Sequence, residues 1–324
     1  MSKKYAIVAI GTNSTRLLVA DVEPDVPRVD VARSIGTRIG EGLGESGRLG
    51  DEPIRRTLDA IAQFHRTARG HYVRLFAVAT SALRRAENGE EFAREVQAAL
   101  GVPLRVLSGD EEAAAAYRGA FTALGSLRGQ RAGVLDVGGG STEYAAGDSP
   151  SPENVVSCEL GAVRLTEAVP ELAGGGSPVA EAIVEQARAA ARKALAPLGT
   201  CAPVERLALV GGSATTTAAI ARGRAIPAAS QALTRADLQR TLERLLGMNL
   251  EERKAVAGMK AQRADILPAG IVLIDTAMEI LGKDEAIATT ADLLLGVLLQ
   301  ERDAVAGQRP VSRAASKTQR GMRP

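Results

Sequence analysis

The chain has 324 residues, with 40 Lys and Arg, 38 Asp and Glu, and 45% hydrophobic residues. This length predicts about two domains, each able to bury a core, and the apolar content excludes a disordered chain. The absence of Trp, with four Phe and four Tyr, excludes a base-stacking platform for single-stranded nucleic acid. Two His and two distant Cys exclude a multi-histidine metal centre, a zinc ribbon and a disulfide framework, so any metal would be held by carboxylates, as Mg²⁺ is.

The positive charges are concentrated near the end of the chain. Residues 306–324 hold five bases and no acid, which leaves 35 bases and 38 acids in the rest. We expect a disordered basic tail at 306–324 and no nucleic-acid partner, because the folded part lacks an excess of bases. No signal peptide is recognised, and no run approaches roughly 18 apolar residues. We therefore expect no membrane association and a cytoplasmic location.

The first part of the chain alternates predicted strands and helices, which is typical of α/β proteins. Strands are expected at 5–10, 16–21, 28–34, 73–79 and 104–107, and helices at 51–69, 90–100 and 113–124. A glycine turn at 11–14 joins the first two strands. Residues 42–47 spell GxGxxG, but no strand precedes them and no helix opens after them, so a loop is expected there instead of a dinucleotide site.

The pattern then starts again. A strand at 132–136, a glycine turn at 137–142 and a strand at 143–146 repeat the first unit, so that Gly11 aligns with Gly138 and Ser14 with Ser141. We expect two similar lobes, 1–124 and 125–305, that face each other across a cleft. Packing of the last helix back on the first lobe is an alternative to its packing within the second. Later elements are expected as helices at 178–198, 233–246, 250–259, 268–281 and 293–303, strands at 207–210 and 286–290, and a third glycine turn at 211–216.

The glycine turns are candidate phosphate-binding loops, with plain tight hairpins as the alternative. Glycine allows close approach of a ligand to the backbone, and successive N–H groups form concave anion sites. No Walker A loop is present. The candidate phosphate-binding residues of the three turns are Thr12, Asn13, Ser14, Gly138, Gly139, Gly140, Ser141, Thr142, Gly212 and Ser213.

Acidic residues near the turns are candidates for metal binding and proton transfer. A hairpin can bring Asp136 and Glu143 to one side of the second turn, where two carboxylates beside a phosphate site suit Mg²⁺; the alternatives are a turn-capping and a solvated acid. Ser108 and Glu111 fit a helix capping box. Glu112 has no such duty, so spacing alone leaves open whether it activates a water molecule that attacks phosphorus.

Arg84 lies just past a predicted strand end, where loops line clefts in α/β folds. Its planar guanidinium suits phosphate oxygens, and an ordinary surface arginine is the alternative.

Taken together, these segments resemble the exopolyphosphatase/guanosine pentaphosphate phosphohydrolase (Ppx/GppA) family of the actin, Hsp70 and sugar-kinase superfamily. The resemblance runs over about residues 5–305. Its motifs are GTNSTR (11–16), ATSALR (79–84), SGDEEA (108–113), DVGGGSTE (136–143), GAVRL (161–165), GGSATT (211–216) and RAD (263–265). The SGxEEA segment followed by DxGGGSTE at this distance is the most specific of them.

The resemblance implies two actin-like (ribonuclease H-like) α/β lobes with an active site in the cleft between them. It implies Mg²⁺-dependent release of terminal phosphate from inorganic polyphosphate, with pppGpp as the alternative substrate and Mn²⁺ as the alternative ion. It assigns Glu112 as the catalytic glutamate, Asp136 and Glu143 as metal-linked acids, and Arg84 as a substrate contact. The folded part has more acids than bases, which argues against a large basic channel, so short chains are the expected substrate. Longer family members carry further C-terminal domains, so a groove for long polymers would need a homodimer here.

One residue departs from the family pattern. The first turn of the family normally follows an Asp, and this chain has Ala9 there. Loss of that carboxylate could weaken Mg²⁺ binding and turnover, so a low-activity polyphosphate or nucleotide sensor is an alternative to the enzyme. A sugar-type kinase is a further alternative, against which the SGxEEA segment argues.

Overall fold

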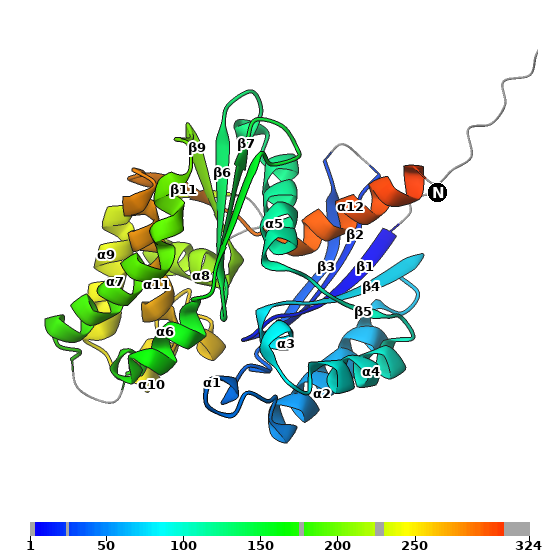
Figure 1. Ribbon diagram of the computed structural model, residues 1–324, viewed down its shortest axis with the longest axis horizontal. Coiled ribbons are helices and arrows are strands. Elements are labelled where there is room, and N and C mark those ends of the chain that lie inside the picture. Colours follow the sequence, from blue (N-terminus) through cyan, green and yellow to red (C-terminus); the bar gives the residue numbers. More distant parts are fainter. Residues whose placement is uncertain (1–3, 24–25, 175–177, 224–229, 308–324) are drawn as a thin grey trace, which may run out of the picture.

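The computed structural model describes residues 4–23, 26–174, 178–223 and 230–307, which form two α/β lobes side by side (Figure 1). Each lobe is built on one mixed sheet, with strand orders β3-β2-β1-β4-β5 and β10-β11-β9-β6-β7-β8. The two-lobed α/β architecture expected from the sequence is confirmed. The lobe boundary between residues 124 and 125 stays a prediction, and residues 308–324 of the expected tail lie outside the described residues.

The first sheet begins with an antiparallel hairpin and continues with parallel strands. Its strands are β1 (Lys4–Ile10), β2 (Thr15–Asp21), β3 (Arg28–Ile35), β4 (Arg74–Ala79) and β5 (Leu104–Val106). Helices α2 (Asp51–Ala68) and α4 (Gly89–Leu100) cover one face of this sheet. In the apolar core between them, Ala6 and Val8 of β1 pack with Phe64 and Phe92. Alternate residues of β1 face the opposite side, as expected for a strand buried on both faces.

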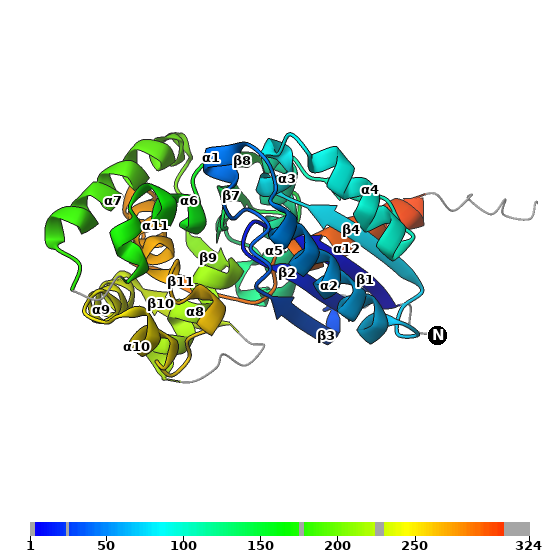
Figure 2. The ribbon, with the colours of Figure 1, turned by 90° about the horizontal axis from the view of Figure 1, so that it is seen from below.

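The second sheet repeats this order of hairpin and parallel strands and adds β10 as an antiparallel edge strand. Its strands are β6 (Ala132–Val137), β7 (Thr142–Gly147), β8 (Asn154–Cys158), β9 (Arg206–Val210), β10 (Gln231–Thr234) and β11 (Glu285–Ala288). Its helices are α6 (Ala162–Ala168), α7 (Glu181–Leu195), α8 (Gly211–Arg222), α9 (Arg235–Leu246), α10 (Leu250–Lys254) and α11 (Leu267–Ile280). They gather on one side of the second lobe, around the apolar helix α11 (Figure 2).

Two helices lie between the sheets. Helix α5 (Gly109–Ala123) follows the last strand of the first sheet but packs on β6, β7 and β8, and α12 (Leu293–Gly307) follows the second sheet but packs on α5 and β1 (Figure 1). A Cβ atom on Gly119 or on Gly296 would overlap backbone atoms of the facing helix. One core therefore joins both sheets through α5 and α12.

Several local expectations were wrong. Residues 211–216 are not a turn but the first half of α8, and Arg84 lies not in a loop but in the short helix α3 (Ser81–Arg85). Helix α5 starts at Gly109, four residues before the predicted start, because the Ser108–Glu111 capping box holds its first turn. The remaining short elements are α1 (Leu43–Ser46), η1 (Gly125–Leu127), η2 (Pro170–Ala173), η3 (Ala196–Thr200) and η4 (Ala261–Arg263). Among the helices of the described ranges, none has the length and apolar character needed to cross a bilayer.

Candidate active site

The two glycine hairpins have the same turn and touch each other. Gly11 N donates to Ser14 O at 3.0 Å in the first turn, and Gly138 N donates to Ser141 O at 3.0 Å in the second. A Cβ atom on Gly139 would lie 3.1 Å from Thr12 Cβ, and one on Gly140 would lie 2.7 Å from Thr12 Oγ1. The second turn therefore needs glycine because the opposite turn leaves no room for side chains.

The tips of both turns have unused hydrogen-bond donors. In the part of the chain that the structure describes, the backbone N–H groups of Thr12, Asn13, Gly139 and Gly140 have no hydrogen-bond partner. The buried side-chain amide of Asn13 also lacks a partner there. Unpaired donors of this kind, at the mouth of a cleft, form a site for an anion.

A cavity of about 90 Å³ lies between the turns. Both turns and the start of α8 line it, together with the acids Glu112, Asp136 and Glu143 and the arginines Arg16 and Arg263. Of the residues expected from the sequence, Thr12, Asn13, Ser14, Glu112, Asp136, Gly138, Gly139, Gly140, Ser141, Glu143 and Gly212 line this cavity.

Three expected residues do not line it. The Thr142 hydroxyl donates to Leu160 O at 2.7 Å, which ties β7 to the segment after β8. Ser213 is buried inside α8 and faces Gly270 of α11, where a Cβ atom would lie 2.5 Å from its hydroxyl oxygen. Both contacts are structural. Arg84 lies beside the cavity and contacts one of its acids, as described below.

The three acids of the cavity come from three adjoining elements. Asp136 and Glu143 face each other as partners on β6 and β7, as a hairpin predicts, and Glu112 lies in the first turn of α5. Burial raises the pKa of Glu112 to about 7 and that of Asp136 to about 6. Burial, and then the charge of Glu112, raises the pKa of Glu143 well above its usual range. A cation beside these carboxylates would relieve this cost of ionisation.

This donor set fits a hard metal ion held in part by other ligands. The described residues contain no group of three or more His, Cys, Asp or Glu side chains close enough to hold a metal ion by themselves. Mg²⁺ is commonly held by one or two carboxylates, with water and substrate phosphates completing its octahedron. Asp136 and Glu143, beside a site for an anion, match that mode.

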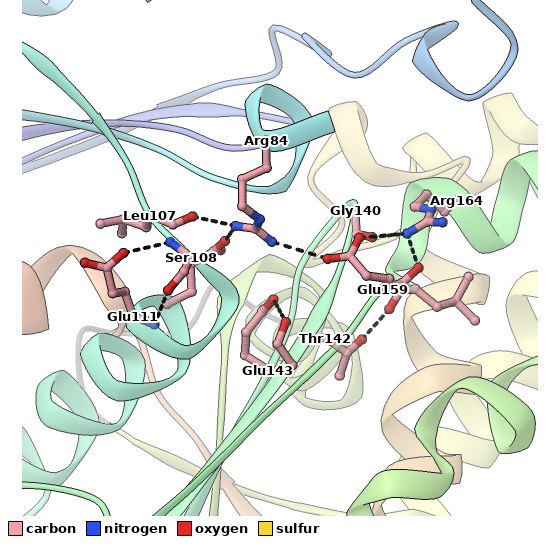
Figure 3. Close-up of polar contacts among 12 residues, drawn as sticks. Arg84, Leu107, Ser108, Glu111, Gly140, Thr142, Glu143, Glu159 and Arg164 are labelled. Atoms are coloured by element: carbon pink, nitrogen blue, oxygen red, sulfur yellow. Dashed lines mark hydrogen bonds and ion pairs between the residues drawn. The ribbon is translucent and has the colours of Figure 1, made fainter. Parts of the chain in front are cut away.

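Arg84 contacts Glu112, and it lies beside Leu107 (Figure 3). Its Nη1 donates to Glu112 Oε1 and to Leu107 O, the latter at 2.8 Å. Glu112 is almost fully buried, so this contact orients its carboxylate at the edge of the cavity. Arg84 therefore contacts the candidate base directly. The sequence argument, which used only the location of Arg84 just after a predicted strand, does not predict this contact.

Two arginines of the cavity are not singled out by the sequence pattern. Arg16 forms an ion pair with Asp292 at 2.5 Å, and Arg263 from η4 lies against Gly212, where a Cβ atom would overlap its guanidinium group. Burial, and then the charge of Arg16, lowers the pKa of Arg263 to about 10. Both arginines could have been found from the family motifs, because Arg16 ends the first motif and Arg263 begins the last one.

Comparisons with known proteins agree with this geometry. The model of the Ppx/GppA phosphatase family matches residues 18–304. Exopolyphosphatase 2 of Mycobacterium tuberculosis is 35% identical over 289 residues, which cover 84% of this chain and 89% of that protein.

Solved structures match over nearly the whole chain. The Ppx/GppA family member of Aquifex aeolicus is 28% identical with a TM-score of 0.77, over 95% of this chain and 99% of that one. An exopolyphosphatase of Cytophaga hutchinsonii is 25% identical with a TM-score of 0.84, over 93% of this chain and 98% of that one. The expected two-lobed α/β fold is thereby confirmed as that of solved Ppx/GppA family members. Both the family match and the relatives lead to one conclusion: the chain belongs to the Ppx/GppA phosphatase family and is a hydrolase that acts on phosphoanhydride bonds.

Proposed function

We propose that this protein is an exopolyphosphatase that releases terminal orthophosphate from inorganic polyphosphate and requires Mg²⁺. The observation that supports this most is the pair of touching glycine turns, whose free N–H groups border a cavity lined by three acids and two arginines. An anhydride of phosphate needs both features, because its oxygens need donors and its hydrolysis needs a base for the attacking water.

The residues of the cavity divide the reaction among them. The N–H groups of the two turns, with Arg16 and Arg263, bind the oxygens of the terminal and penultimate phosphates. Glu112 accepts a proton from the attacking water at its carboxylate, and a pKa of about 7 suits a general base near neutral pH. Arg84 keeps this carboxylate oriented. Asp136 and Glu143 would hold Mg²⁺, directly or through water.

The metal would neutralise charge on the phosphate oxygens when it is bound. The protein residues provide the rest: the turns orient the phosphate chain and Glu112 removes the proton.

A nucleotide substrate, pppGpp, is the second candidate. A neighbouring cavity of about 120 Å³ shares Thr12 and Asn13 with the phosphate site and is lined in part by Val163 and Ile266. Apolar side chains beside a phosphate site could contact a nucleoside, which inorganic polyphosphate lacks. A sensor without turnover is the third candidate, because Ala9 removes one acid.

Phosphate release distinguishes these candidates. We expect the wild type to release orthophosphate from tripolyphosphate and longer chains with Mg²⁺, and to lose this activity in EDTA. Faster release from pppGpp would favour the nucleotide, and tight binding without release would favour the sensor.

The matched variants are Glu112→Gln and Asp110→Asn, which remove one charge each from the start of α5. Asp110 is exposed and lies outside the cavity. Glu112→Gln should slow release by about 10²- to 10⁴-fold, the usual contribution of a general base, and Asp110→Asn should not. Equal rates in the two variants would contradict the role of Glu112.

A further inference from the structure

A glutamate lies between two arginines from opposite lobes at the edge of the cavity. Glu159, just after β8, has Oε1 3.6 Å from Arg84 Nη2 of the first lobe and Oε2 3.2 Å from Arg164 Nη1 of the second (Figure 3). These three residues form a bridge across the lobes, which we call the Arg84–Glu159–Arg164 bridge. None of the proposed catalytic steps uses Glu159 or Arg164.

Both arginines are connected to the site itself. Arg84 contacts Glu112, and Arg164 Nη1 lies 3.4 Å from the carbonyl oxygen of Gly140 in the second turn. Neither arginine lines the cavity, but each contacts a residue that does, so their guanidinium groups lie next to the place where the turns would hold a phosphate chain.

The three side chains of the bridge differ in how far they are buried. The side chains of Arg84 and Arg164 are 19% and 28% exposed, whereas that of Glu159 is 55% exposed. Arg84 Nη2 is buried and has no hydrogen-bond partner among the described residues, since Glu159 lies too far for one. The arginines are thus held in place, and the glutamate can turn into solvent at little cost, because ion pairs of exposed groups contribute little.

An anion with more oxygens would use these donors better than Glu159 does. Guanidinium groups bind phosphate oxygens with paired hydrogen bonds, which the 3.6 Å contact does not provide. We propose that Glu159 is a displaceable substitute for the substrate: the phosphate next along the chain from those in the cavity displaces its carboxylate from Arg84 and Arg164. This proposal rests on the proposed function, because it takes a chain of phosphates as the ligand.

The proposal predicts a dependence on chain length. Orthophosphate fits within the turns and does not reach the bridge, whereas tripolyphosphate does and has to compete with Glu159. Glu159 therefore lowers the affinity for chains, and its loss should favour chains selectively.

The test compares Glu159→Gln with Glu171→Gln, which removes one charge from an exposed glutamate of η2 in the same lobe. Binding of tripolyphosphate and of orthophosphate is measured by calorimetry in EDTA, where no turnover is expected. Glu159→Gln should tighten tripolyphosphate binding by about fivefold, the scale of one exposed ion pair, with orthophosphate binding unchanged. Glu171→Gln should change neither, and Arg164→Gln should weaken the binding of tripolyphosphate alone.

Kinetics with Mg²⁺ give a second measurement. Glu159→Gln should lower the KM for tripolyphosphate with little change in kcat. Unchanged tripolyphosphate binding in Glu159→Gln, equal tightening in Glu171→Gln, equal tightening for orthophosphate, or no binding in any variant would overturn the proposal. If the wild type releases no phosphate while Glu159→Gln still binds tripolyphosphate more tightly, the proposed function fails and the role of Glu159 stands. If the wild type releases phosphate but Glu159→Gln binds tripolyphosphate no more tightly, the proposed function stands and the role of Glu159 fails.

Discussion

The two glycine hairpins have the same backbone but carry different charges beside the turn. In the first, Ala9 faces Arg16 across the strands; in the second, Asp136 faces Glu143 at the equivalent positions. We call the side of the cavity with Asp136 and Glu143 the anionic wall, and the side with Arg16, which is paired with Asp292, the cationic wall; both turns close with the same 3.0 Å hydrogen bond. Two turns with the same backbone can thus suit different ligands, one phosphate oxygens and the other a cation. The pair of residues beside each turn determines which ligand it suits.

Removal of the anionic wall should have the largest effect. Asp136→Asn or Glu143→Gln should lower kcat for phosphate release by about 10²- to 10³-fold, because each removes a charge that would hold Mg²⁺ beside the reacting phosphate. Rates are measured over a titration with Mg²⁺. Asp148→Asn, at an exposed acid just after β7, is the control and should keep the wild-type rate. Wild-type rates in both site variants would contradict a metal on this wall.

The acidic wall should also make the metal-free protein sensitive to pH. The pKa of Glu112 is raised from 4.5 to about 7, so the folded state holds a proton that the unfolded chain has already lost in this range. Stability in EDTA should therefore fall as pH rises from 4.5 to 7, by roughly 3 kcal/mol for this group. Urea unfolding at several pH values measures this. Glu112→Gln should flatten the profile, and an equally steep fall in that variant would contradict the assignment.

Loss of the cationic wall should weaken substrate binding. Arg16→Gln should raise the KM for tripolyphosphate by about tenfold, the scale of one hydrogen bond to a charged group, with a smaller change in kcat. Arg33→Gln, on the exposed strand β3, is the matched control. A fall in kcat with unchanged KM would place Arg16 outside substrate binding.

Making the two walls alike should have the smallest effect. Ala9→Asp restores an acid at the position equivalent to Asp136, so the Mg²⁺ concentration for half-maximal release should fall by about threefold. Ala9→Asn has nearly the same shape without the charge and should leave that concentration unchanged. A higher Mg²⁺ requirement in Ala9→Asp would mean that the added acid mainly neutralises Arg16.

Features set by local pattern were predictable from the sequence, and features set by packing were not. The repeat, both hairpins and the pairing of Asp136 with Glu143 follow from strand periodicity and turn chemistry. Residues 211–216 look like a turn because Gly, Ser and Thr are weak helix formers, yet Gly211 turns the chain with φ of 83° into helix α8. Arg263 reaches the cavity from a distant segment, and Asp292 reaches Arg16 from another, and strand or helix periodicity reveals neither contact.

The packing of α5 on the second sheet affects which parts of the site can move together. Because α5 packs on β6, β7 and β8, Glu112 is held beside the second sheet and Glu143. Arg84, in α3, belongs to the other lobe. A rotation of one sheet against the other would therefore leave the three acids together as one rigid body and separate Glu112 from the arginine that orients it.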